Sequence, residues 1–339
     1  MQSPRTIREL RNCQLANGDT NVTISFIDGK IVAVGQDELY VPFVDVDGRR
    51  VMPGIIDVHV HDRFPFSKEY IMSLSQIPAN VLECMSETWE HLSAAALEGG
   101  VTSVCKMPNT AVPITSPEIL EKSEEAIGEQ PISHRVWFGA TPDNLHEIEE
   151  ATKHPAVCGV KMYMGSSTGN LLVSKRSDQQ RIFETCAELG VLCAIHAEDE
   201  QLMQENRRLL HGEPLISDHC RVRDTVVETS AVRQALELAR VTGCTIHLCH
   251  ISTPESVKLA RDAKDRGVRV TVGVCPHHIW LDKENLRKED GGLYKMNPPL
   301  RTSQQDAFAS PIRTTARLCR CAGIRPCAAF TGFQDARAV

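Results

Sequence analysis

From residue 55 onward, short apolar runs alternate with helical stretches. The apolar runs predict strands at 55–60, 101–106, 134–139, 156–162, 191–196, 244–249 and 268–274. The stretches between them include predicted helices at 88–98, 116–127, 178–189, 223–241 and 254–266. Repeated strand–helix units require a parallel sheet with both faces covered. This alternation predicts an α/β fold.

Seven strands favour a (β/α)₈ barrel with one strand unaccounted for. The rival is an open doubly wound sheet, but no Gly-x-Gly-x-x-Gly motif follows any of the predicted strands. Helix ends are marked in the expected way, since Ser116-Pro117 suits a helix start and Gly190 and Gly243 suit helix ends. We therefore expect an incomplete barrel spanning residues 53–306.

Residues 1–52 have a different character. Val22, Ile24 and Phe26 alternate with polar or small residues, and Asp28-Gly29 is a hairpin signal before a return strand at 30–34. A third short run follows at 40–46. This segment predicts part of a small sheet, too small to stand alone.

Composition sets limits on the class of protein. The chain has 339 residues, 42% of them hydrophobic and 24% charged, which is ordinary for a soluble globular protein with one large barrel or two smaller domains. A net charge of −7 gives neither a nucleic-acid footprint nor a basic membrane patch. No apolar run approaches a membrane span, and the N-terminus lacks the apolar core of a signal peptide. Thirteen cysteines without Cys-x-x-Cys spacing fit free thiols in the cytoplasm.

The stretch from Val51 to Phe64 carries the strongest chemical signal. A short buried strand introduced by Pro53-Gly54 ends in His59 and His61. Positions two apart on a strand point to the same face, so two imidazoles leave the strand end side by side. This arrangement suits a divalent metal better than core packing, although two solvated histidines at a strand end remain the plain alternative.

Polar residues recur after the other predicted strands. Asn109 follows the second strand, Lys161 ends the fourth, His196 ends the fifth and His250 follows the sixth. Active sites of barrels of this type lie at the carboxyl ends of the strands. Each residue also has an ordinary interpretation: His196 as a satisfied core histidine, His250 as a helix cap, and Lys161 as a lysine that reaches solvent.

With these motifs, the chain resembles the cyclic amidohydrolases, whose first barrel strand carries the His-x-His pair. Arg63, two residues further on, narrows the resemblance to dihydroorotase, in which this arginine holds a substrate carboxylate. The resemblance implies that the N-terminal segment joins a C-terminal segment in a β-sandwich beside the barrel. It runs from about residue 5 to Asp306.

The resemblance also implies a metal centre. Its ligands would be His59, His61, His196 and His250, and imidazole suits zinc. A lysine pointed at a metal would repel it, so Lys161 fits only as the carbon dioxide-derived carbamate that the family uses to bridge two divalent ions. A hydroxide between the ions would then open a cyclic amide reversibly.

Substrate choice depends on further residues. Arg63 and Asn109 together suit a carboxylate, and Asn297 lies in a segment resembling a substrate-contacting part of dihydroorotase, unless that segment is a surface turn. Dihydroorotate carries a ring carboxylate that hydantoins lack, so dihydroorotase is favoured over hydantoinase, with allantoinase as the closer rival. His277 and His278 are interpreted as structural residues or as neighbours of the metal ligands.

The resemblance fails after Asp306. The family's eighth strand should end in an aspartate that binds a metal and moves a proton, and no such motif occurs here, so no catalytic residue is assigned. Residues 307–339 contain five Arg, three Cys and one acid, Asp335, without clear periodicity. We interpret this tail as the product of a premature or shifted reading frame, which would leave a barrel of doubtful stability and activity.

Three hypotheses follow. The chain is a dihydroorotase converting dihydroorotate to N-carbamoyl-aspartate in pyrimidine biosynthesis, another cyclic amidohydrolase such as allantoinase or hydantoinase, or a non-catalytic relative that binds a partner such as a carbamoyltransferase subunit. The expected partners are small molecules, without nucleic acid or membrane, and a homodimer is left open.

Overall fold

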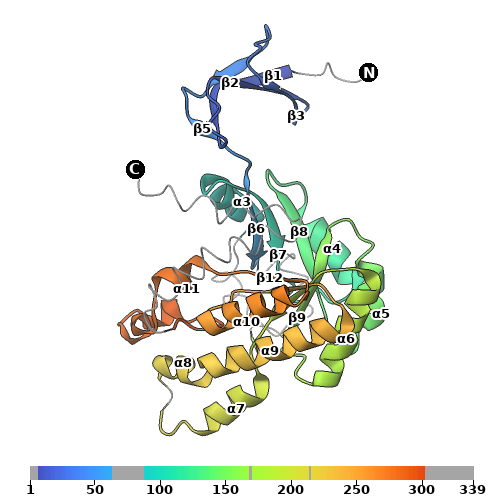
Figure 1. The fold of residues 1–339 in the computed structure, drawn as a ribbon, viewed down its shortest axis with the longest axis vertical. Coiled ribbons are helices and arrows are strands. Elements are labelled where there is room, and N and C mark those ends of the chain that lie inside the picture. Colours follow the sequence, from blue (N-terminus) through green and yellow to red (C-terminus); the bar gives the residue numbers. More distant parts are fainter. Residues whose placement is uncertain (1–6, 63–87, 168–169, 214, 302–339) are drawn as a thin grey trace. The chain divides into compact units, whose positions relative to one another are not determined.

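The computed structural model describes residues 7–62, 88–167, 170–213 and 215–301. The chain divides into two compact units, Met1–Gly54 and Ile55–Val339 (Figure 1). Arg63, Asp306 and the tail at 307–339 lie outside the described residues, so the structure leaves the predictions made for them untested.

The N-terminal unit is built around a five-stranded sheet. Its strands are β1 (Ile7–Leu15), β2 (Val22–Ile27), β3 (Lys30–Gly35), β4 (Phe43–Asp45) and β5 (Arg50–Val51). The predicted hairpin joins β2 to β3 through Asp28 and Gly29, whose φ angles of 51° and 76° suit a two-residue turn between twisted strands. Strand β1 pairs with β2, β4 and β5, and Cys13, Val22 and Ile24 form a small core.

The second unit contains one parallel sheet of seven strands, each paired with the next along the chain. The strands are β6 (Ile55–Val60), β7 (Val101–Lys106), β8 (Ser133–Gly139), β9 (Val157–Tyr163), β10 (Cys193–His196), β11 (Ile246–Leu248) and β12 (Val270–Val272). They form a curled, incomplete barrel, which confirms the predicted fold class. Among the described residues, no eighth strand lies between β12 and β6.

Helices connect the strands and cover the sheet (Figure 1). The α-helices are α3 (Trp89–Glu98), α4 (Pro117–Ile127), α5 (Leu145–Ala151), α6 (Arg176–Leu189), α7 (Glu200–Arg208), α8 (His219–Val222), α9 (Thr225–Thr242), α10 (Pro254–Asp265) and α11 (Pro276–Trp280). Short 3₁₀ helices are η1 (Ile216–Asp218), η2 (Lys283–Arg287) and η3 (Gly291–Tyr294). Ser116 caps α4 by accepting from Ile119 N at 3.3 Å, and Gly190 and Gly243 end their helices in left-handed conformation, as predicted.

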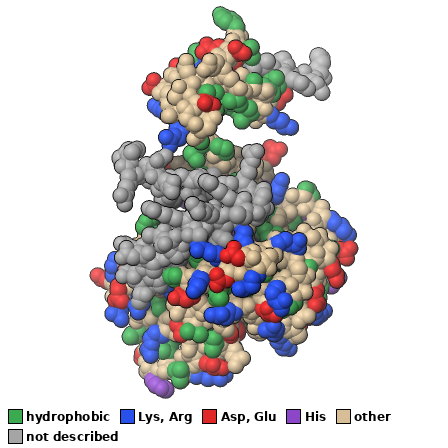
Figure 2. Space-filling model, viewed as in Figure 1, with side chains coloured by type: hydrophobic (Ala, Val, Ile, Leu, Met, Phe, Trp, Pro, Cys, Tyr) green, Lys and Arg blue, Asp and Glu red, His purple; other side chains and the backbone are tan. Residues whose placement is uncertain are grey.

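Outward faces of these helices carry mixed charge. Figure 2 shows basic and acidic side chains interspersed over the visible helical surface of this unit. On α9, for example, Arg240 pairs with Glu237 at 2.8 Å. No helix among the described residues is long and apolar enough to cross a membrane.

Strand periodicity separates two sets of side chains in the sheet. In β9, Val160 and Met162 pack into the large core shared with the helices. Lys161, between them, points to the opposite face and pairs in register with Ala194 of β10. Ala194 belongs to a separate cluster that includes Trp137. The interior of the barrel therefore holds Lys161 and its neighbours, away from the helices.

Candidate metal centre

The two histidines at the end of β6 face each other. Their Nε2 atoms lie 3.2 Å apart, with ring centroids at 5.1 Å. Asn109 Oδ1 lies 2.8 Å from His61 Nδ1. Because a carbonyl oxygen only accepts, Nδ1 of His61 carries the proton and Nε2 keeps its lone pair. Asn109 thus orients His61 with Nε2 toward His59.

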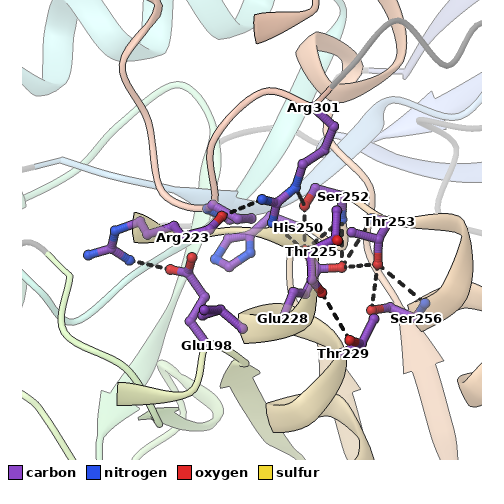
Figure 3. Close-up of polar contacts among 12 residues, drawn as sticks. Glu198, Arg223, Thr225, Glu228, Thr229, His250, Ser252, Thr253, Ser256 and Arg301 are labelled. Atoms are coloured by element: carbon purple, nitrogen blue, oxygen red, sulfur yellow. Dashed lines mark hydrogen bonds and ion pairs between the residues drawn. The ribbon is translucent and has the colours of Figure 1, made fainter. Parts of the chain in front are cut away.

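A second pair of facing histidines comes from the neighbouring strands β10 and β11. His196 ends β10 and His250 follows β11, and His196 Nδ1 lies 3.1 Å from His250 Nε2. Glu198 Oε2 accepts from His196 Nε2 at 2.7 Å, which leaves Nδ1 of His196 unprotonated. Arg223 in turn donates to Glu198 (Figure 3). A carboxylate therefore sets the tautomer of His196.

His250 lies in an unusual backbone conformation. Its φ of 37° is left-handed, which is uncommon for a residue other than glycine. Glu228 on α9 holds the following turn, because its carboxylate accepts from Ser252 N at 3.1 Å, from Thr253 N at 3.1 Å and from both hydroxyls (Figure 3). Thr253, rather than His250, caps α10 by accepting from Ser256 N. The alternative interpretation of His250 as a cap is therefore wrong.

The two pairs meet at one place. The rings of His59 and His250 have centroids 5.0 Å apart. Burial, followed by the charge of Lys161, holds the pKa of His59 well below its usual range, and burial with the neighbouring His196 does the same for the pKa of His250. The imidazoles are therefore neutral at physiological pH and available as ligands.

Lys161 lies in the barrel interior without solvent exposure. Its Nζ is 3.0 Å from Cys249 Sγ, and it makes no ion pair with any described residue. Lys106 on β7 is equally buried, yet its ammonium lies 3.9 Å from Asp62 and 3.6 Å from Glu124. A buried ammonium without a carboxylate partner is costly. A carbamate on Lys161 beside bound cations would remove this mismatch.

A cavity of about 910 Å³ opens in front of these residues. The centre's residues on its wall are His59, His61, His196 and His250, and Asn297 is a further lining residue. Asn297 Nδ2 donates to Ser167 Oγ at 3.3 Å. The structure thus brings together all four predicted histidines and places Asn109 and Asn297 nearby, with Asn109 against His61.

The geometry of the donors fits zinc. Two nitrogens bound to one tetrahedral zinc at about 2.0–2.1 Å lie about 3.3 Å apart. The pairs His59–His61 and His196–His250 have facing nitrogens at 3.2 Å and 3.1 Å. In each pair, an oxygen on the far side of one ring fixes the tautomer, as is usual for metal-binding histidines. Two pairs correspond to two ions.

Comparison with known proteins agrees with this architecture. A model of the amidohydrolase family matches residues 50–291. The chain belongs to the amidohydrolase family. The resemblance predicted from the sequence is therefore confirmed at the level of the family.

Curated members of the amidohydrolase family resemble this chain over most of its length. Dihydroorotase of Methanosarcina mazei is 32% identical over 284 residues, which cover 81% of this chain and 58% of the relative. Allantoinase of Bacillus velezensis is 31% identical over 294 residues, covering 84% and 60%. The chain spans less than two thirds of the length of these relatives.

Solved amidohydrolase structures share the fold. L-hydantoinase from Arthrobacter aurescens superimposes with a TM-score of 0.79 at 24% identity, covering 91% of this chain and 66% of that one. Dihydropyrimidinase from Brevibacillus agri gives a TM-score of 0.77 at 23% identity, covering the same shares. At this identity the likeness concerns the fold.

Sequence reasoning missed the residues that support the histidines. Glu198, Arg223 and Glu228 are all buried and charged. The sequence contained a signal for Glu198, because this residue lies two positions after His196 and projects to the same side of the chain. Glu228 also had one, since it interrupts an apolar face of α9 that includes Ala231 and is otherwise buried in the core. Charged residues on apolar helix faces mark partners elsewhere in the fold.

Proposed function

We propose that this chain is a dihydroorotase-like cyclic amidohydrolase, which opens the cyclic amide of dihydroorotate reversibly to N-carbamoyl-aspartate. The observation that carries this proposal is the two histidine pairs whose nitrogens are spaced for zinc, beside a buried lysine that has no carboxylate partner among the described residues. The similarity to curated dihydroorotases supports the substrate.

In this proposal, His59, His61, His196 and His250 would hold two divalent ions, zinc first among them, and Lys161 would contribute to the same centre as a carbamate. Bound metal would lower the pKa of water and polarise the amide carbonyl. The chain's own contribution is to hold the imidazoles neutral and oriented. Asn109 and Glu198 do this through the ring nitrogens that face away from the metals.

Arg63, Asn109 and Asn297 are the proposed substrate-binding residues. Arg63 would bind the ring carboxylate through its planar fork, together with Asn109, and Asn297 lies on the cavity wall. We expect Arg63→Met to raise KM for dihydroorotate at least tenfold with metal content unchanged, since removal of a charge-assisted pair costs about 2–5 kcal/mol. An equal rise for a neutral cyclic amide would contradict carboxylate recognition.

The test of the main proposal is turnover by purified, zinc-loaded protein with dihydroorotate, allantoin and hydantoin in parallel. Dihydroorotate should be hydrolysed with the highest kcat/KM, and His59→Ala should abolish this activity together with metal binding at the four histidines. Preference for allantoin would favour the second candidate, which the similarity to the Bacillus velezensis allantoinase supports.

Metal retention without hydrolysis of any of the three would favour the non-catalytic interpretation. In that case a carbamoyltransferase subunit should co-purify or bind in a pull-down from defined components. We further propose a reducing cytoplasmic location, because all the cysteines in the described part of the chain are free thiols.

A further inference from the structure

The turn that leads from β12 into α11 carries three metal-binding side chains that belong to neither histidine pair. Cys275, His277 and His278 each offer a ligand atom, and these atoms all lie within 4.8 Å of one another. The rings of the two histidines have centroids 4.4 Å apart at an angle of 63°. One short segment therefore gathers a thiol and two imidazoles.

His278 shows why this cluster is more than packing. Its Nε2 lies 3.1 Å from the carbonyl oxygen of Pro298, so Nε2 carries the proton and Nδ1 holds a lone pair. Nδ1 is buried and has no hydrogen-bond partner among the described residues, and the whole residue is only 6% exposed. A buried acceptor without a donor destabilises the folded state.

A bound cation would satisfy this nitrogen. Metal-binding histidines commonly donate the other ring N–H to a backbone carbonyl, which is the arrangement that His278 makes with Pro298. The combination of thiolate and imidazole is typical of zinc and similar first-row metals. Hard, oxygen-seeking cations such as magnesium are not expected there.

The cluster faces the main cavity. Cys275, His277 and His278 line the same space as His59, His61 and His250. Three protein ligands with an open side correspond to a zinc ion that keeps a further position for water or another ligand. Metal held on this wall would therefore be accessible to molecules in the cavity.

We propose that Cys275, His277 and His278 form an accessory site for a zinc-class ion, separate from the four-histidine centre and open to the same cavity. The proposal goes beyond the proposed function and does not depend on it. It predicts one metal equivalent per chain that is bound through sulfur.

Titration of metal-free protein with Co²⁺ tests the site, because a cobalt–thiolate bond gives a near-ultraviolet charge-transfer band that imidazole ligands do not give. We expect this band in the unmodified chain and its loss in Cys275→Ser, with one fewer bound equivalent. Cys220→Ser is the matched control, since Cys220 is also half-buried but hydrogen-bonds Leu300 O instead. The Cys220→Ser variant should keep both the charge-transfer band and the full number of bound metal equivalents.

His278→Gln guards against a folding artefact. It should lower Co²⁺ affinity at least tenfold while the circular dichroism spectrum stays unchanged. His59→Ala should remove metal from the four-histidine centre and leave the thiolate band, which separates this proposal from the proposed function. Absence of the band in the unmodified chain, or its persistence in Cys275→Ser, would overturn the accessory site.

Discussion

Two buried lysines in neighbouring parts of the barrel have opposite environments. Lys106 is surrounded by Asp62 and Glu124, whereas Lys161 contacts Cys249 and has no acidic partner among the described residues. Such a difference is expected between a lysine that only stabilises the fold and a lysine that is modified to a carbamate. It gives a pair of substitutions that separate stability from metal binding.

We predict that Lys161→Ala lowers the metal content by at least half, and that added short carboxylic acids partly restore both metal and activity. Lys106→Met is the control. It should lower the stability by about 3 kcal/mol, because it leaves a buried carboxylate unpaired, but keep the metal content of the folded protein. Elemental analysis and urea unfolding measure the two effects. Unchanged metal content in Lys161→Ala would contradict the bridging role.

The pKa of His247 leads to a prediction about how the stability of the fold depends on pH. It lies in β11 and contacts Thr271 Oγ1 at 2.9 Å, and burial, with the charge of Lys161, lowers its pKa to about 4. Between this value and the ordinary histidine pKa of about 6.5, the unfolded chain binds a proton that the folded chain does not. The contribution of His247 to the free energy of unfolding is therefore lost as the pH falls from about 6.5 to 4, by up to about 1.4 kcal/mol per pH unit.

The measurement is the urea midpoint at pH 7.5 and pH 5 for the original chain and for His247→Gln. Because the other histidines titrate in both proteins, the difference between the two pH slopes isolates His247. The substituted chain should lose less stability on acidification. Equal slopes would mean that His247 is protonated in the folded state.

At the scale of elements, α9 and the turn after β11 act as one unit. Glu228 on α9 accepts from two backbone N–H groups of the turn, and Arg301 packs against the same carboxylate at 3.5 Å (Figure 3). This turn contains His250 in its left-handed conformation. The helix thus holds the turn that carries His250, one of the proposed metal ligands.

We predict that Glu228→Gln lowers the stability by about 3 kcal/mol and weakens metal binding about tenfold, since an amide N–H₂ would face donors where a carboxylate accepted. Glu237→Gln on the same helix is the control. Glu237 is exposed and pairs only with Arg240 among the described residues, so little change is expected. Competition with a metal indicator measures the affinity. Equal affinities in both variants would assign Glu228 a purely structural role.

At the scale of the molecule, the sheet has two edges, β12 and β6, in the described part of the chain. The described residues provide no carboxylate after an eighth strand. General acid–base help is worth roughly 10²–10⁴ in rate. We therefore predict that residues 1–301 by themselves bind dihydroorotate but turn it over at least a hundredfold more slowly than a longer relative such as the dihydroorotase of Methanosarcina mazei.

The test is to join residues 1–301 to the C-terminal part of a longer curated dihydroorotase. The fusion should recover the rate and raise the stability, because it covers both edges of the sheet. Mass spectrometry should confirm that the reference chain consists of residues 1–301. Full activity of that chain would show that another group moves the proton.

Local pattern was enough to predict the seven parallel strands and five of the helices, because apolar periodicity and turn residues act over a few positions. It also located His59, His61, Lys161, His196 and His250 at strand ends, since the barrel fold places such ends at one face. Helices α5 and α7 were not among the predicted stretches. Both are short and contain few apolar residues among many charged ones.

Tertiary structure alone decided which residues support the ligands. Asn109 reaches His61 across 48 positions, and Arg301 reaches Glu228 across 73. Such pairings follow from the order and curvature of the sheet, which no local window of sequence contains. The spacing of the imidazole nitrogens is decided in the same way, because His196 ends β10 and His250 follows β11, and these strands are brought side by side only by strand pairing across the intervening helices.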